Sequence, residues 1–95
     1  MEDLQNQARV HAGQAVDIKV RLVGAEHGYV ENAWRTKGQV LYALGYYPEA
    51  QEAFSKALAL AEKLKIPDAE ASRCRSIALC LEAQGKFDEA KSYYE

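Results

Sequence analysis

A short sequence pattern occurs twice in this chain, forty residues apart. Residues 45–50 read GYYPEA and residues 85–90 read GKFDEA. Each glycine follows a helix-like segment, where a helix end uses a left-handed residue, and Pro48 falls where a first helical turn tolerates a missing N–H. A repeat of about 20 to 50 residues built as helix, turn and helix is typical of α-solenoids. We therefore predict an all-α fold, an α-solenoid of antiparallel helix hairpins with about five helices.

Three segments around these turns have the apolar spacing of amphipathic helices. One runs from Pro48 to Lys65 and is closed by Pro67, because the residue before a proline is pushed out of the helical region. The other two run over residues 30–44 and 68–84. Each predicted helix carries its apolar residues on one face, and the alanines and Gly38 on these faces let helices approach closely. The three apolar faces comprise Ala33, Trp34, Val40, Leu41 and Leu44; Ala50, Ala53, Phe54, Ala57, Leu58, Ala61 and Leu64; and Ala71, Cys74, Ile77, Ala78 and Leu81.

The first third of the chain gives two patterns at once. Apolar and charged residues alternate from Val16 to Leu22, which is the period of a half-buried strand. The same stretch also fits a helical face that includes Ala12, Val16 and Val20. No other segment could pair with a strand, and a lone strand would leave its backbone unsatisfied. We predict a helix from about Leu4 to Val23, with Gly13 costing roughly 1 kcal/mol relative to alanine, followed by a loop over residues 24–28.

Size and charge narrow the classes of function. A chain of 95 residues forms one domain with a thin core. Its 12 Lys+Arg against 14 Asp+Glu give a net charge of −2, which provides no general attraction for nucleic acid or anionic membranes. The two cysteines, Cys74 and Cys80, fit neither a metal knuckle nor a disulfide scaffold. With an acidic start and no apolar run long enough to span a membrane, we expect a cytoplasmic protein.

Reactive centres are not indicated. His11 and His27 are far apart, no two His or Cys share a one-turn spacing, and we expect no metal site. Gly24 and Gly28 lack the fingerprint and strand context of a phosphate-binding loop, and the serines lack a nucleophile elbow. Paired carboxylates lie in the first turns of the predicted helices, where the helix dipole stabilises negative charge, and this explains their presence. We expect no cofactor and no enzymatic activity.

The apolar positions resemble the tetratricopeptide repeat (TPR) family. In that family, large, small and large residues in a first helix are followed by alanine, an aromatic residue and alanine in the second. The two units here read Trp34, Gly38, Leu41, Ala50, Phe54 and Ala57, then Cys74, Ala78, Leu81, Ala90 and Tyr94. The 40-residue period exceeds the usual value of about 34, as in the long-helix variants of kinesin light chains and bacterial signalling regulators. Residues 30–95 match the family pattern well. The first third of the chain matches it only loosely, because Lys19 stands where the family has a small residue.

The resemblance implies a protein–protein interaction scaffold, in which first helices line a concave groove for a peptide or partner helix. Arg35 and Arg75 are equivalent by the repeat and could together hold a carboxylate, although surface arginines usually are solvated or pair with a glutamate. An RNA reader is disfavoured by the net charge. The groove positions transferred from the family are Asn32, Arg35, Gln39, Tyr42, Ser72, Arg75, Leu79 and Glu82.

The organisation that follows is one domain with three parts: an N-terminal helix and loop at 1–28, a repeat at 29–66 and an incomplete repeat at 67–95. Because the sequence stops within a helix, we expect a piece of a larger multi-repeat protein. The alternative function is a self-associating module or the sensor portion of a signalling regulator. We expect a homo-oligomer through exposed terminal helices, with Ala78, Leu81, Ala90 and Tyr94 lining the exposed end.

Overall fold

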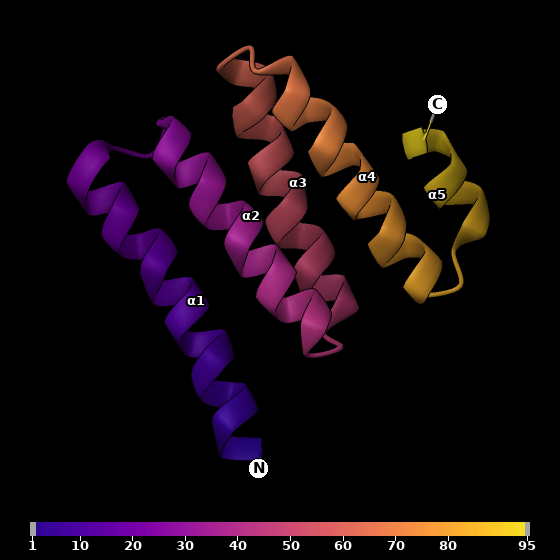
Figure 1. The fold of residues 1–95 in the computed structure, drawn as a ribbon, viewed down its shortest axis with the longest axis horizontal. Helices are drawn as coiled ribbons and strands as arrows, with labels where there is room; N and C mark the ends of the chain where they lie inside the picture. Colours follow the sequence, from indigo (N-terminus) through magenta and orange to yellow (C-terminus); the bar gives the residue numbers. More distant parts are fainter. Residues whose placement is uncertain (1, 95) are drawn as a thin grey trace.

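The chain forms five helices that lie side by side in chain order, as the computed structural model in Figure 1 shows. The structure describes residues 2–94. The helices are α1 (Glu2–Val23), α2 (Gly28–Ala43), α3 (Tyr47–Lys63), α4 (Pro67–Ala83) and α5 (Phe87–Tyr94). The main packing contacts join each helix to the next one along the chain. The predicted all-α solenoid is therefore confirmed.

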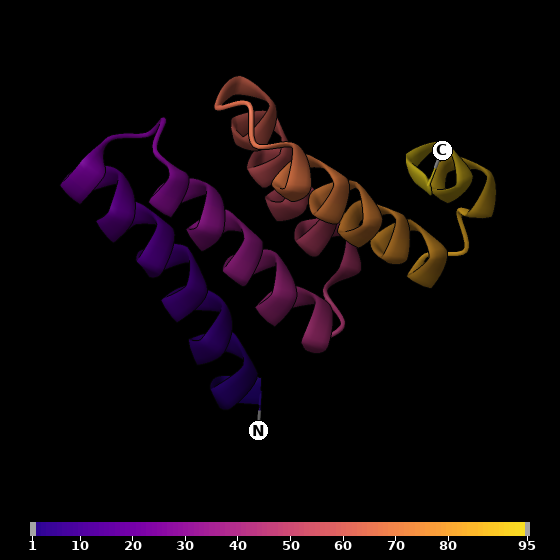
Figure 2. The same ribbon diagram turned by 45° about the horizontal axis from the view of Figure 1, so that its top comes forward.

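The helices form a thin slab. The Cα atoms extend over 39 × 37 × 13 Å, and the turned view in Figure 2 shows successive helices reversing direction, with α3 set partly behind α2 and α4. Each helix between α1 and α5 thus packs against neighbours on two sides and meets solvent on the others. In such a layer, burial has to come from contacts between neighbouring helices.

The repeated sequence produces a repeated turn. Gly45 and Gly85 follow α2 and α4 with φ of 89° and 78°, the left-handed region that glycine adopts without strain. Across the first turn the Tyr46 N–H donates to the Leu41 carbonyl at 2.9 Å, and across the second Lys86 donates to Leu81 at 2.8 Å. These bonds close both helices in the same way.

The third helix ends earlier than predicted. It was expected to reach Lys65, but it stops at Lys63 because Lys65 itself takes the left-handed conformation, with φ of 57°. The N–H of Ile66 then donates to the carbonyl of Ala61 at 2.9 Å, which is the bond that the glycine turns also make. A lysine thus stands where the ends of α1, α2 and α4 use glycine, and no sequence signal marked it.

The first helix explains why its sequence resembles a strand. Two residues along an α-helix turn by about 200°, so alternating apolar residues fall on opposite sides. Val16 is 3% exposed and faces α2, whereas Ile18 and Leu22 are 52% and 73% exposed. The prediction of a helix is confirmed, and the alternation reflects apolar residues on two faces. The predicted loop ends one residue early, because His27 caps α2 by accepting from the Tyr29 N–H at 3.1 Å.

The core lies between α2, α3, α4 and α5 and is built mainly of small residues. A Cβ added to Gly38 would lie 2.7 Å from the Cε1 atom of Phe54, so the aromatic ring occupies the space that a larger residue would take. This contact joins α2 and α3 at the centre of the slab. The buried cluster contains Leu41, Ala50, Ala53, Phe54, Ile77, Ala78, Cys80, Leu81 and Ala90, and Ala57 is also buried.

Some predicted core residues lie elsewhere. Trp34 is only partly buried and packs against the cluster, with the Lys37 and Lys56 ammonium groups 5.0 and 4.9 Å from its ring centre. Cys74 is half-buried. Tyr94 is 52% exposed.

The expectation that Ala78, Leu81 and Ala90 line an exposed end was wrong. All three residues are at most 1% exposed, because α4 and α5 pack against each other through them. The exposed aromatic residues at this end of the slab are Phe87, Tyr93 and Tyr94.

A buried ion pair, absent from the sequence predictions, joins α2 to α4. The Arg73 guanidinium donates from Nε and from one terminal nitrogen to the two carboxylate oxygens of Glu31, both at 2.9 Å. Their side chains are 10% and 5% exposed. Removing one partner from such a pair leaves an uncompensated charge inside the protein, whereas replacing both with apolar residues often costs little.

We predict that Gly38→Ala lowers the free energy of unfolding by about 1 to 3 kcal/mol, because the added methyl group overpacks the site against Phe54. The matched control is Gly28→Ala, where no atom lies within 4 Å of the added Cβ; it should be neutral or slightly stabilising. Urea unfolding followed by circular dichroism measures both. Equal stability of the two variants would contradict the tight contact.

We also predict that Arg73→Met or Glu31→Leu alone lowers the unfolding free energy by about 3 to 5 kcal/mol, and that the double variant Glu31→Leu/Arg73→Met recovers most of that loss. A double-mutant cycle by chemical denaturation gives the coupling between the two side chains. Additive losses in the cycle would show that the pair does not hold α2 to α4.

Candidate partner-binding groove

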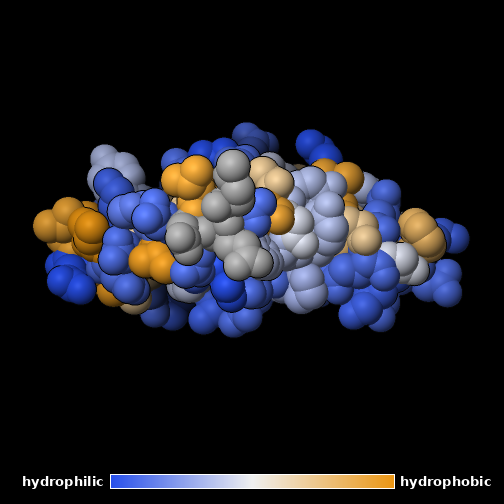
Figure 3. Space-filling model, turned by 90° about the horizontal axis from the view of Figure 1, so that it is seen from below, coloured by the Kyte–Doolittle hydropathy of each residue, from blue (hydrophilic) through white to orange (hydrophobic). Residues whose placement is uncertain are grey.

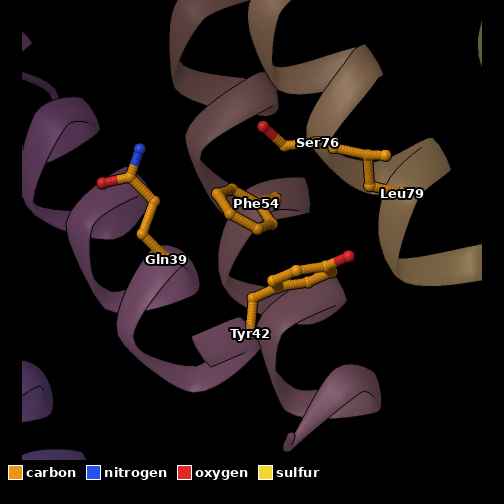
Figure 4. Close-up of a pocket in the computed structure, with 5 residues that line it drawn as sticks. All are labelled: Gln39, Tyr42, Phe54, Ser76 and Leu79. Carbon is orange, nitrogen blue, oxygen red and sulfur yellow. The ribbon is translucent and has the colours of Figure 1, made fainter. Parts of the chain in front are cut away.

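A preformed pocket lies between the first helices of the two hairpins. It is lined by Gln39 and Tyr42 from α2, Phe54 from α3, and Ser76 and Leu79 from α4, and its volume is about 280 Å³. Figure 4 shows the Phe54 ring between the two walls. We call this the groove pocket.

Local packing holds the aromatic residues of the groove pocket in place. Gly38 lets the Phe54 ring sit directly against α2, which makes the ring the floor of the pocket. The Tyr42 ring meets the Tyr47 ring edge-on, with centres 5.2 Å apart and an angle of 64° between planes. Aromatic pairs favour this arrangement. The pocket therefore needs little ordering when a ligand binds, which lowers the entropic cost of binding.

The groove pocket has an apolar floor and two polar side chains. Tyr42 and Leu79 are 36% and 42% exposed, so the pocket offers apolar surface to solvent. The Gln39 amide and the Ser76 hydroxyl can donate and accept hydrogen bonds, and Ser76 already donates to the Ser72 carbonyl at 3.1 Å. A pocket of this kind suits one apolar side chain with the adjoining peptide backbone.

The structure brings together three of the eight predicted groove residues: Gln39, Tyr42 and Leu79. Arg35 instead donates to the Asn32 side chain from Nε at 3.2 Å and from a terminal nitrogen at 2.7 Å. Ser72 is partly buried and accepts from Arg73 at 3.1 Å.

Arg75 lines a separate hollow between α4 and α5, of about 320 Å³, together with Ala71, Cys74, Tyr93 and Tyr94. Arg35 and Arg75 therefore do not meet in one pocket, and the structure does not form the two-arginine clamp considered from the sequence. The eighth position, Glu82, reaches Tyr94, and their hydrogen bond raises the pKa of the Tyr94 hydroxyl.

Two lining residues of the groove pocket were missed. Phe54 was assigned to the core alone, although its ring is both core and pocket floor. Ser76 lies one helical turn after Ser72, which was predicted, so the four-residue spacing on α4 was the signal that could have found it. Among the described residues, no cluster of three or more His, Cys, Asp or Glu could hold a metal ion, and no helix is long and apolar enough to cross a membrane.

Comparison with known proteins identifies the family. Residues 29–95 match the tetratricopeptide repeat family, so the chain belongs to it. Over 61 residues, or 64% of this chain, the sequence is 39% identical to a TPR repeat-containing protein of Methanocaldococcus jannaschii. The matched segment spans only 10% of that relative. No solved structure matches significantly. Tetratricopeptide repeats are generally protein–protein interaction modules.

The two cysteines on α4 should differ in reactivity. Burial raises the pKa of the Cys80 thiol to about 11, so roughly one molecule in a thousand carries its thiolate at pH 8. The pKa of Cys74 is also raised, by burial and by the carboxylates of Glu62 and Glu70, but its side chain is only half-buried.

We predict that iodoacetamide at pH 8 labels Cys74 of the folded protein well before Cys80, and that denaturant makes the two rates equal. Peptide mass spectrometry measures the labelling at each site. Faster labelling at higher pH is expected, since deprotonation supplies the nucleophile. Labelling of native Cys80 as fast as Cys74 would contradict its burial.

Proposed function

We propose that this chain is a peptide-binding module whose groove pocket takes one apolar side chain of a partner protein. Residues 29–66 and 67–95 act as two repeat units, and the pocket forms where their first helices meet. The observation that supports this is the preformed apolar hollow between α2 and α4, with a fixed aromatic floor. The family's general role as an interaction module agrees with it.

The pocket favours an aliphatic or aromatic anchor over an acidic one. No cationic side chain lines it, and Arg35 is engaged by Asn32. Burying an apolar side chain of leucine size contributes about 1.5 to 3 kcal/mol, which by itself gives weak binding. Additional contacts outside the pocket are therefore needed for a physiological affinity.

Two broader points accompany the proposal. The chain works as a scaffold without cofactor or enzymatic activity, as part of a longer protein; the relative it matches is about ten times longer than the matched segment. Its compartment is the reducing cytoplasm, which agrees with two free cysteines six residues apart on one helix.

We predict that a capped peptide with one central leucine shifts the amide signals of Gln39, Tyr42, Ser76 and Leu79 in ¹⁵N NMR spectra, and that the same peptide with glycine at its centre does not. Leu79→Glu should weaken binding at least about tenfold, which is 1.4 kcal/mol, because it places a charge in the apolar wall.

The matched control is Ala59→Glu, which adds the same charge at an exposed position of α3 outside the pocket. It should leave peptide binding unchanged. Identical titrations for the leucine and glycine peptides, or an equal loss of peptide affinity in the Leu79→Glu and Ala59→Glu variants, would contradict the proposal.

A further inference from the structure

A buried salt bridge joins the two helices that form the walls of the groove pocket. The Glu31 carboxylate on α2 and the Arg73 guanidinium on α4 are 5% and 10% exposed. Charged side chains usually stay in water, and Figure 3, which views the slab from its lower edge, shows hydrophilic side chains over most of the surface that it displays. Taking two charges out of water is costly, and apolar residues of similar volume often give equal or greater stability. Stability alone therefore does not account for this pair.

The salt bridge is a direct link between helices that otherwise pack through a third one. The main packing contacts join α2 to α3 and α3 to α4, and α3 is set partly behind the other two in Figure 2. Among the residues that the structure describes, the side-chain hydrogen bonds between α2 and α4 are the two bonds of the Glu31–Arg73 pair. The relative placement of the two pocket walls is thus set directly at this point.

A forked ion pair fixes direction as well as distance. Nε and a terminal nitrogen of Arg73 donate to separate oxygens of Glu31, both at 2.9 Å. Two bonds between planar groups require the helices to be aligned. Sliding one helix by a single residue, a rise of about 1.5 Å, would break that alignment, whereas apolar contacts are non-directional. The pair therefore specifies the register of α4 against α2.

A short chain of hydrogen bonds leads from the ion pair to the groove pocket. Arg73 also donates to the Ser72 hydroxyl at 3.1 Å, and the Ser76 hydroxyl donates to the Ser72 carbonyl at 3.1 Å. Ser76 lines the pocket, and Figure 4 shows it with Leu79 on the wall across from Gln39. The carboxylate on α2 is thus connected, through Arg73, to the α4 wall of the pocket.

We propose that Glu31 and Arg73 are a positioning pair for the groove pocket, which holds its two walls in the register and spacing that a ligand side chain requires. The inference rests on the proposed peptide-binding function and assigns the contact that preserves the shape of its site. Neither residue lines the pocket, so the pair acts on binding through wall placement. Because a preorganised site binds at lower entropic cost, loss of the pair weakens binding and reduces discrimination between ligand side chains of different size.

The first test measures the free chain. Residual dipolar couplings of backbone amides, recorded by NMR, give the orientation of α2 relative to α4. The wild-type couplings should fit one orientation, and those of Glu31→Leu/Arg73→Met should report a different or an averaged one, while circular dichroism shows the same helix content. The matched control is Arg9→Met/Glu49→Leu, which removes the same residue types from a second forked ion pair that joins α1 to α3. It should leave the orientation of α2 relative to α4 unchanged.

A conservative variant separates positioning from charge. Arg73→Lys keeps the positive charge beside Glu31 but cannot form the planar fork. A positioning role predicts that the orientation of α2 relative to α4 changes in this variant too. Wild-type couplings in Arg73→Lys, or in Glu31→Leu/Arg73→Met, would overturn the inference.

The second test titrates two capped peptides, with a central leucine and a central tryptophan, against the wild-type chain and both double variants. Glu31→Leu/Arg73→Met should bind the leucine peptide at least about threefold more weakly and discriminate less between the two peptides, whereas Arg9→Met/Glu49→Leu should keep the wild-type values. Equal affinities in wild type and Glu31→Leu/Arg73→Met would contradict the positioning role. Failure of the wild-type chain to bind either peptide would instead contradict the proposed function, and the dipolar couplings would still decide whether the pair positions the walls.

Discussion

The structure depends on the close contact between Gly38 and Phe54. Because position 38 has no side chain, the aromatic ring of α3 lies against the backbone of α2 and fills the centre of the slab. The same ring forms the floor of the groove pocket, so one contact contributes both to stability and to the shape of the pocket. In the second unit, Ala78 and Tyr94 occupy the equivalent positions, and the tyrosine stays exposed. The deep aromatic floor is therefore found in the first unit alone.

Much of the fold could be predicted because the repeated residues mark where helices end and which of their faces are buried. The glycines at 45 and 85 mark turns with matching hydrogen bonds, and alanine-rich stripes mark the buried faces. Features that depend on pairing across forty residues could not be read in this way. The Glu31–Arg73 pair joins two positions that are not equivalent in the repeat, so neither periodicity nor resemblance indicates it. The left-handed Lys65 likewise could not be predicted, because lysine has no preference for positive φ.

Three of the eight predicted groove residues line one pocket, and the other five do not. Gln39, Tyr42 and Leu79 meet because their helices are neighbours across α3, which the family pattern implies. The arginines separate because each lies one unit apart along the solenoid and finds a local partner or hollow of its own. Side-chain partnerships of this kind are decided by a few ångströms of helix placement. A sequence pattern with a period of forty residues does not specify them.

The buried ion pair has a mechanical consequence. Glu31 and Arg73 join the first halves of α2 and α4, whereas the lining residues Tyr42 and Leu79 stand in the second halves of these helices. The ion pair therefore fixes the separation of α2 and α4 at one level along their length. The same two helices form the walls of the groove pocket, so a single buried contact sets the distance between those walls.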